Sequence, residues 1–129
     1  MNLIEEIHLD NRLILYVFDL SHPISEDTAK VEILVKTETK LKADYFISPE
    51  DFRQVKNIFG DKICYEYKKE RSFISIENQD IIRDELIETF KSNSLRYISS
   101  PSFPKNLALS KLREIKNNPY KYLKREPAT

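Results

Sequence analysis

The stretch at residues 12–20, RLILYVFDL, constrains the fold more than any other part of this chain. All six residues from 13 to 18 are apolar or aromatic. Because successive side chains of a strand point to opposite faces, both faces of this run are apolar. A strand with two apolar faces is typical of one that is covered on both sides. The run therefore predicts a central strand of a sheet, with cover on each face.

The segments on either side of this run predict antiparallel neighbours. Residues 3–9 are expected to form a strand that is joined to the central one by a two-residue turn at Asp10 and Asn11. That turn would place Ile7 opposite Ile14. Residues 29–38 alternate between apolar and polar side chains, which predicts a half-exposed strand beside the central one.

Further along the chain, helical patterns alternate with short β-prone runs. Ser48, Pro49 and Gly60 predict the start and the end of a first helix. The remaining patterns predict helices at 79–92 and 105–116, a second hairpin made of 62–68 and 72–76, and short strands at 41–47 and 95–98. This order favours one α+β domain over residues 1–129, in which a mostly antiparallel sheet packs against about three helices.

The composition excludes several classes of function. With Gly60 as the single glycine, neither a P-loop nor a dinucleotide-binding loop can be written. With Cys64 as the single cysteine, an internal disulfide and a cysteine zinc cluster are excluded. No apolar run approaches the length of a membrane span, and the first residues lack the basic region of a signal peptide. We therefore expect a cytoplasmic protein with no membrane contact.

The charges are unevenly distributed, although the formal net charge is zero. Residues 1–51 hold 5 basic and 11 acidic side chains, whereas residues 104–129 hold 7 basic and 2 acidic ones. The basic segment 104–129 is predicted to be a helix and an arm docked on the rest of the domain. It could instead be a surface for a partner. The candidate interaction surface comprises Lys111, Arg113, Lys116, Tyr120, Lys121, Tyr122, Lys124 and Arg125.

Three polar groups are candidates for chemistry, and each has a structural alternative. Asp19, Ser21 and His22 could form a hydrolytic set, but their spacing favours hydrogen bonds within the turn. His8 with His22 and Asp19 is the one combination to consider for a metal, and nothing in the sequence places the three together. Cys64 is interpreted as a small buried apolar residue. We predict no catalytic residue, no metal and no cofactor.

These observations predict a small interaction module rather than an enzyme. We expect it to act through its surface on a protein partner, or as a homo-oligomer. The alternative is binding of nucleic acid through the basic, tyrosine-containing segment 105–125, where phosphates could be bound and bases stacked. The sequence pI of about 6.7 is far from the basic values typical of nucleic-acid binders.

Overall fold

The computed structural model describes residues 2–123, and they belong to two compact units of the chain. The first, which we call the sheet unit, comprises Met1–Thr37 and Tyr65–Ser100. The second, the helical unit, comprises Glu38–Cys64 and Pro101–Thr129. Each unit is therefore built from two segments that are far apart in the sequence.

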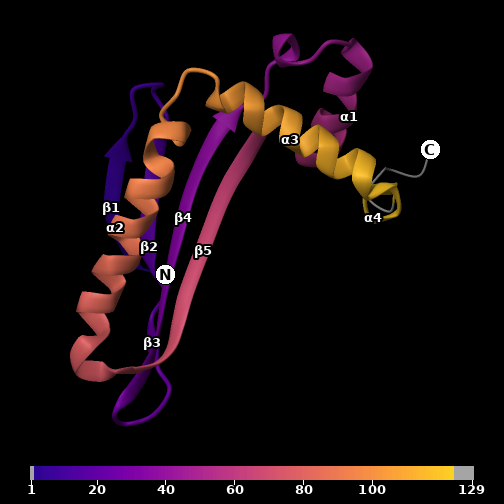
Figure 1. Ribbon diagram of the computed structural model, residues 1–129. Helices are drawn as coiled ribbons and strands as arrows, with labels where there is room; N and C mark the ends of the chain where they lie inside the picture. Colours follow the sequence, from indigo (N-terminus) through magenta and orange to yellow (C-terminus); the bar gives the residue numbers. More distant parts are fainter. Residues whose placement is uncertain (1, 124–129) are drawn as a thin grey trace. The chain divides into compact units, whose positions relative to one another are not determined.

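Five strands form one antiparallel sheet (Figure 1). They are β1 (Asn2–His8), β2 (Ile14–Asp19), β3 (His22–Pro23), β4 (Thr28–Lys40) and β5 (Lys62–Ser75). β2 lies between β1 and β4, which confirms that it is a central strand. The short β3 continues along β4 in the register that β2 sets, and β5 also pairs with β4.

Four α-helices and two short 3-10 helices complete the described residues. They are η1 (Ala43–Tyr45), α1 (Pro49–Phe59), η2 (Ile76–Asn78), α2 (Gln79–Ile98), α3 (Phe103–Asn117) and α4 (Pro119–Leu123). The α+β class is confirmed. The start of α1 is confirmed in detail, because the Ser48 hydroxyl accepts a hydrogen bond from the Asp51 N–H, and Gly60 ends the helix with φ 83°.

The turn between β1 and β2 is one residue longer than predicted. Leu9 N–H donates to the Leu13 carbonyl, and Arg12 adopts a left-handed conformation with φ 73°. This combination is typical of three-residue hairpin loops. It pairs Ile7 with Leu15 rather than with Ile14, until a bulge next to Leu3 shifts the register.

Asn11 explains why the longer loop is stable. Its amide nitrogen donates to the carbonyls of Ile98 (2.7 Å) and Ser100 (2.8 Å), and its side-chain oxygen accepts from the Leu13 N–H (3.2 Å). The side chain therefore joins the hairpin to the end of α2. A local turn rule cannot predict such a partner, because it lies 87 residues away.

The second hairpin and two short strands were predicted wrongly. β5 runs without a turn from Lys62 to Ser75, and Glu70, expected in a turn, forms an ion pair with Lys30 of β4 at 2.8 Å. Residues 95–98 continue α2 instead of forming a strand, and residues 43–45 form η1. The long β4 is the pairing partner of β5, and that tertiary contact overrides the local preference for a turn.

The core of the sheet unit lies between α2 and one face of the sheet. Figure 1 shows α2 running across β1 and β2. The sheet side chains of this core are Leu15, Val17, Val31, Ile33 and Val35, all fully buried. From α2, Leu86, Ile87 and Phe90 are buried, and the Phe90 ring lies 4.9 Å from that of Tyr67.

The opposite face of β2 corrects the expectation of cover on both sides. Ile14, Tyr16 and Phe18 are half-buried, and α2 is the one long helix among the described residues of the sheet unit. Phe18 lies opposite the buried Leu34 of β4. Large side chains of neighbouring strands therefore shield one another on this face, without a helical layer in the sheet unit.

The helical unit forms around α1 and α3. Val55 of α1 is fully buried, and Phe103, Leu107, Ala108 and Ile115 of α3 are buried as well. The rings of Phe46 and Phe52 pack at 6.0 Å, and those of Phe59 and Tyr122 at 5.8 Å. Docking of the C-terminal helix thus involves α1 and η1 within this unit.

Candidate interaction surfaces

Some residues of the predicted interaction surface contact other side chains of the helical unit, and others are exposed. Lys111 lies over the Phe59 ring, 5.3 Å from its centroid, and Tyr122 is only 3 % exposed and donates to Glu114 at 2.7 Å. These two side chains are part of the packing of the helical unit. Lys116 is exposed and forms an ion pair with Asp51 at 3.5 Å.

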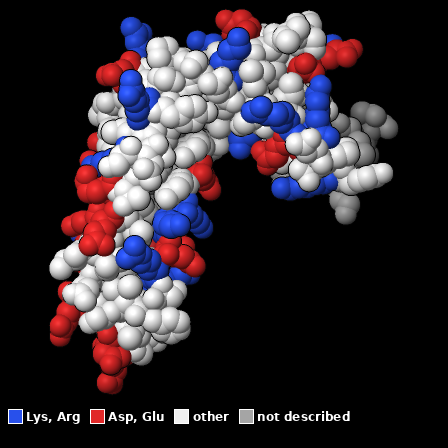
Figure 2. Space-filling model, in the orientation of Figure 1, with Lys and Arg blue, Asp and Glu red and all other residues white. Residues whose placement is uncertain are grey.

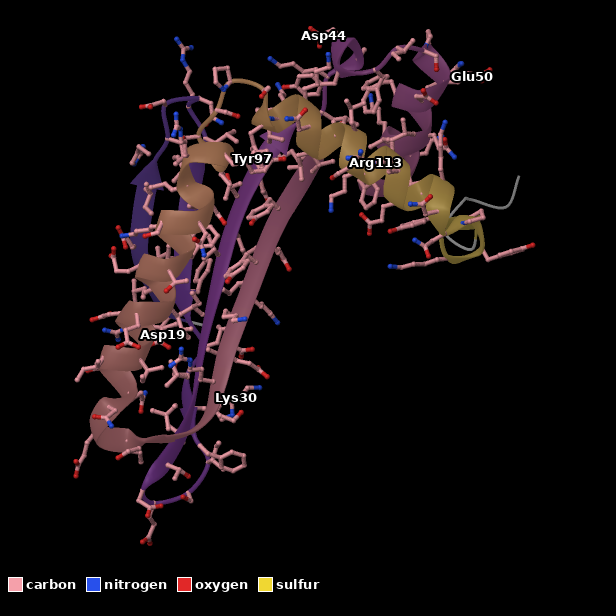
Figure 3. The ribbon with its side chains drawn as sticks, viewed as in Figure 1. Asp19, Lys30, Asp44, Glu50, Tyr97 and Arg113 are labelled. Atoms are coloured by element: carbon pink, nitrogen blue, oxygen red, sulfur yellow. The ribbon has the colours of Figure 1, made fainter. Side chains whose placement is uncertain are left out.

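The remaining part of the predicted surface is exposed. Arg113 projects from α3 (Figure 3), Tyr120 is 82 % exposed, and Lys121 is exposed next to it on α4. Lys124 and Arg125 lie outside the described residues. The helical unit holds 12 basic and 7 acidic residues, so its net charge is +5. The sheet unit holds 9 basic and 14 acidic residues, so its net charge is −5.

A second surface, at one end of the sheet unit, is apolar. We call it the apolar end patch; its residues are Ile24, Phe73, Ile76 and Ile81, exposed by 45, 75, 39 and 58 % respectively. They belong to the turn after β3, the end of β5, η2 and the first turn of α2. The Ile76 N–H donates to the Asp27 carbonyl at 3.0 Å, which joins the two sequence regions at this end (Figure 1).

Phe73 is unusual in its backbone as well as in its exposure. Its φ of 59° lies in the left-handed region, which a bulky L-residue enters at a cost in free energy. Residues held in such conformations are concentrated at functional sites. The exposure of Phe73 could not be predicted from the sequence, because a phenylalanine in a β-prone run is ordinarily expected to be buried.

Acidic side chains flank the residues of the apolar end patch in the sequence, and we call them its rim. Glu26, Asp27, Glu77 and Asp80 are all exposed and lie within a few residues of the patch in sequence. Figure 2 shows largely uncharged surface at the lower end of the sheet unit, with acidic atoms at its margin. The patch therefore combines an apolar centre with a negative rim.

The turn after β2 uses its polar side chains structurally. The Asp19 carboxylate accepts from the Ser21 N–H at 2.9 Å, and the Ser21 hydroxyl accepts from the Glu32 N–H at 3.1 Å. Asp19 also forms an ion pair with Arg83 of α2 at 3.4 Å (Figure 3). His22 is exposed, with its ring nitrogen 3.4 Å from the Leu20 carbonyl. These contacts give Asp19 and Ser21 a structural role in the turn.

Arg83 is at the centre of a charge network on α2. Partial burial lowers the pKa of its guanidinium, but Asp84, Asp19 and Asp80 together outweigh that effect and raise it. A shallow hollow between β1 and α2 is lined by Ile4, Glu5, Arg83, Asp84, Ile87, Glu88 and Lys91. Lys91 contacts both Glu5 at 3.0 Å and Glu88 at 3.7 Å. Since both cations already have carboxylate partners, the hollow is a poor site for an anion.

Other side chains proposed for chemistry are not brought together. His8 is exposed at the end of β1, opposite Ile14, and Cys64 is half-buried in β5. Residues 2–123 contain no group of three or more His, Cys, Asp or Glu side chains arranged to hold a metal ion. Burial, followed by the charges of Tyr67 and Tyr97, raises the pKa of the Tyr65 hydroxyl.

Comparison with protein-family models, with curated proteins and with solved structures found no match. None of the helices in the described part of the chain has the length and apolar character that spanning a membrane requires. The geometry of the surfaces described above is therefore the basis for a functional conclusion.

Proposed function

We propose that this protein is a binding module that recognises a protein partner through the apolar end patch of its sheet unit. The observation that carries the proposal is Phe73, an aromatic side chain that is 75 % exposed and held at φ 59°. Isolated exposed apolar residues are common on protein surfaces. Four large ones from four elements at one end are more typical of an interaction site.

The rim suggests the chemistry of the partner. Glu26, Asp27, Glu77 and Asp80 would attract basic side chains and repel acidic ones. An apolar segment flanked by Lys or Arg fits this arrangement, with an apolar anchor against Phe73 and cations at the rim. Like charge at the rim would disfavour an anionic membrane as the binding partner.

The variant F73N separates binding from folding. Asn enters the left-handed region more readily than Phe, and little buried apolar area is lost at an exposed position. We expect F73N to raise the free energy of unfolding by roughly 1 kcal/mol, measured by urea denaturation. We also expect it to lose the partner that the wild-type protein retains from an extract of its own cells.

The matched control is Ile47→Asn, which removes another exposed apolar side chain, 102 % exposed, from the helical unit. It should retain the partner. If F73N destabilised the protein, Phe73 would have a structural role. If F73N and I47N retained the same partner equally well, the apolar end patch would not be the binding site.

Nucleic-acid binding through residues 105–125 is the second candidate. It is favoured by the net charge of +5 of the helical unit and by the exposure of Arg113, Tyr120 and Lys121. Fluorescence polarisation with a labelled single-stranded oligonucleotide would show binding that weakens steeply with salt. R113A combined with K121A should abolish that binding, whereas F73N should not change it. Absence of binding at micromolar protein and low salt would exclude this function.

A further inference from the structure

The outer edge of β5 is long and remains open. β5 spans 14 residues, and within residues 2–123 it pairs with β4 along one edge and with no strand along the other. In β5, residues 65–67 are half-buried or exposed, and residues 68–73 are all exposed. An exposed strand edge of this length presents unpaired backbone groups that can pair with another strand.

Symmetry restricts how β5 could pair with the β5 of a second copy. Along an antiparallel pair of strands, hydrogen-bonded and non-hydrogen-bonded residue pairs alternate. A two-fold axis cannot convert one kind of pair into the other, so it has to pass through the middle of one pair. A two-fold axis between two identical strands therefore places one residue opposite its own copy. Like charges directly opposite are destabilising, so that central residue has to be uncharged. Among residues 66–71, which form the middle of β5, only Tyr67 is uncharged.

We infer that the protein forms a symmetric dimer in which the β5 strands of two copies pair antiparallel about Tyr67. This register places Glu66 opposite Lys68 of the second copy, twice by symmetry. It also places Tyr65 opposite Lys69 of the second copy, again twice. No like charges meet directly in this stretch. If the axis were shifted by one residue to Lys68, Lys68 would lie opposite Lys68 of the second copy, and Glu66 would lie opposite Glu70 of the second copy.

An ion pair within one chain extends the same charge pattern. The Lys36 Nζ of β4 lies 3.7 Å from the Glu66 Oε1 of β5. Pairing about Tyr67 would continue this row as Lys36, Glu66 and then Lys68 of the second copy, with alternating charge across three strands. The other outer strand, β1, lacks this complementarity, because a bulge interrupts it and Glu5 and Glu6 are adjacent at its middle.

Two charge reversals and their mixture test the register. The register places residue 66 of each copy opposite residue 68 of the other. In a K68E dimer, both residues of each such pair would be carboxylates, and in an E66K dimer, both would be ammonium groups. Each variant alone should dimerise about tenfold more weakly or worse than the wild-type chain in analytical ultracentrifugation. An equimolar mixture should form the heterodimer, because the K68E strand is acidic at both positions and the E66K strand is basic at both.

Lys42→Glu is the matched control, since it makes the same charge change as K68E at an exposed position outside β5. It should dimerise like the wild-type chain, and circular dichroism should show all variants folded. A wild-type chain that remains monomeric at the highest soluble concentration would overturn the inference. So would a mixture of K68E and E66K that stays monomeric. Phe73 takes no part in this register, so the outcome is independent of the proposed partner site.

Discussion

Single residues in this protein perform tasks that their type alone does not indicate. Asn11 could have been a simple turn residue, yet its amide group joins the first hairpin to the end of α2. Lys30 and Glu70 could have been independent solvated charges. Instead they form an ion pair of 2.8 Å across β4 and β5, in a part of β5 that sequence patterns assign to a turn. The partner of each residue, rather than its own type, determines its role.

The Lys30–Glu70 pair predicts a specific titration behaviour. A hydrogen bond from Lys30, with its charge, lowers the pKa of Glu70, and the same contact raises the pKa of Lys30. The contribution of Glu70 to stability is therefore present above its unfolded pKa and is lost as the pH falls through its folded pKa. That of Lys30 is present below its unfolded pKa and is lost as the pH rises through its folded pKa.

NMR titration of the side-chain carboxyl carbon of Glu70 measures the pKa of this residue directly. We expect a midpoint below that of an ordinary glutamate in the wild-type protein, and a higher midpoint in Lys30→Met, because the donor is removed. Lys36→Met is the control, because Lys36 pairs with Glu66 instead. An unchanged Glu70 midpoint in K30M would show that the ion pair does not form in solution.

At the scale of elements, the sequence predicts those whose signals are local. α1 was predicted with its cap and its end, because Ser48, Pro49 and Gly60 act within one or two turns of their own position. The doubly apolar run also identified β2 as central. The continuity of β5 through residues 69–71 and the last residues of α2, 93–98, are not predicted, because they depend on long-range pairing and packing. The stop predicted at residues 92–94 was overridden by a helix whose buried residues extend to Ile98.

The candidate surfaces also include parts that local sequence patterns predict and parts that depend on long-range contacts. Composition identified a basic C-terminal segment, and Arg113, Tyr120 and Lys121 are exposed as an interaction surface requires. Lys111 and Tyr122 belong to the packing, since their partners Phe59 and Glu114 could not be deduced from spacing. The apolar end patch had no signal in the sequence at all. Exposure of Phe73 follows from its place near the end of β5, which is a property of the folded chain.

At the scale of the whole molecule, the division into two compact units bears on how the chain unfolds. Val17 is fully buried in the sheet unit, and Val55 is fully buried in the helical unit. Each valine therefore reports on one unit. A single cooperative domain, as the sequence predicts, would lose stability everywhere when either valine is truncated, whereas two separately stable units would not.

We expect the second behaviour, because Val17 and Val55 are each fully buried in a different compact unit. Val55→Ala should lower stability by about 1–3 kcal/mol through the lost methyl groups and the cavity that remains. In hydrogen exchange followed by mass spectrometry, amides of α1 and α3 should then exchange faster, while those of β2 and the middle of β4 keep their wild-type rates. Val17→Ala should show the reverse pattern. If either variant accelerated amide exchange equally in both units, the chain would be one cooperative domain, as the sequence predicts.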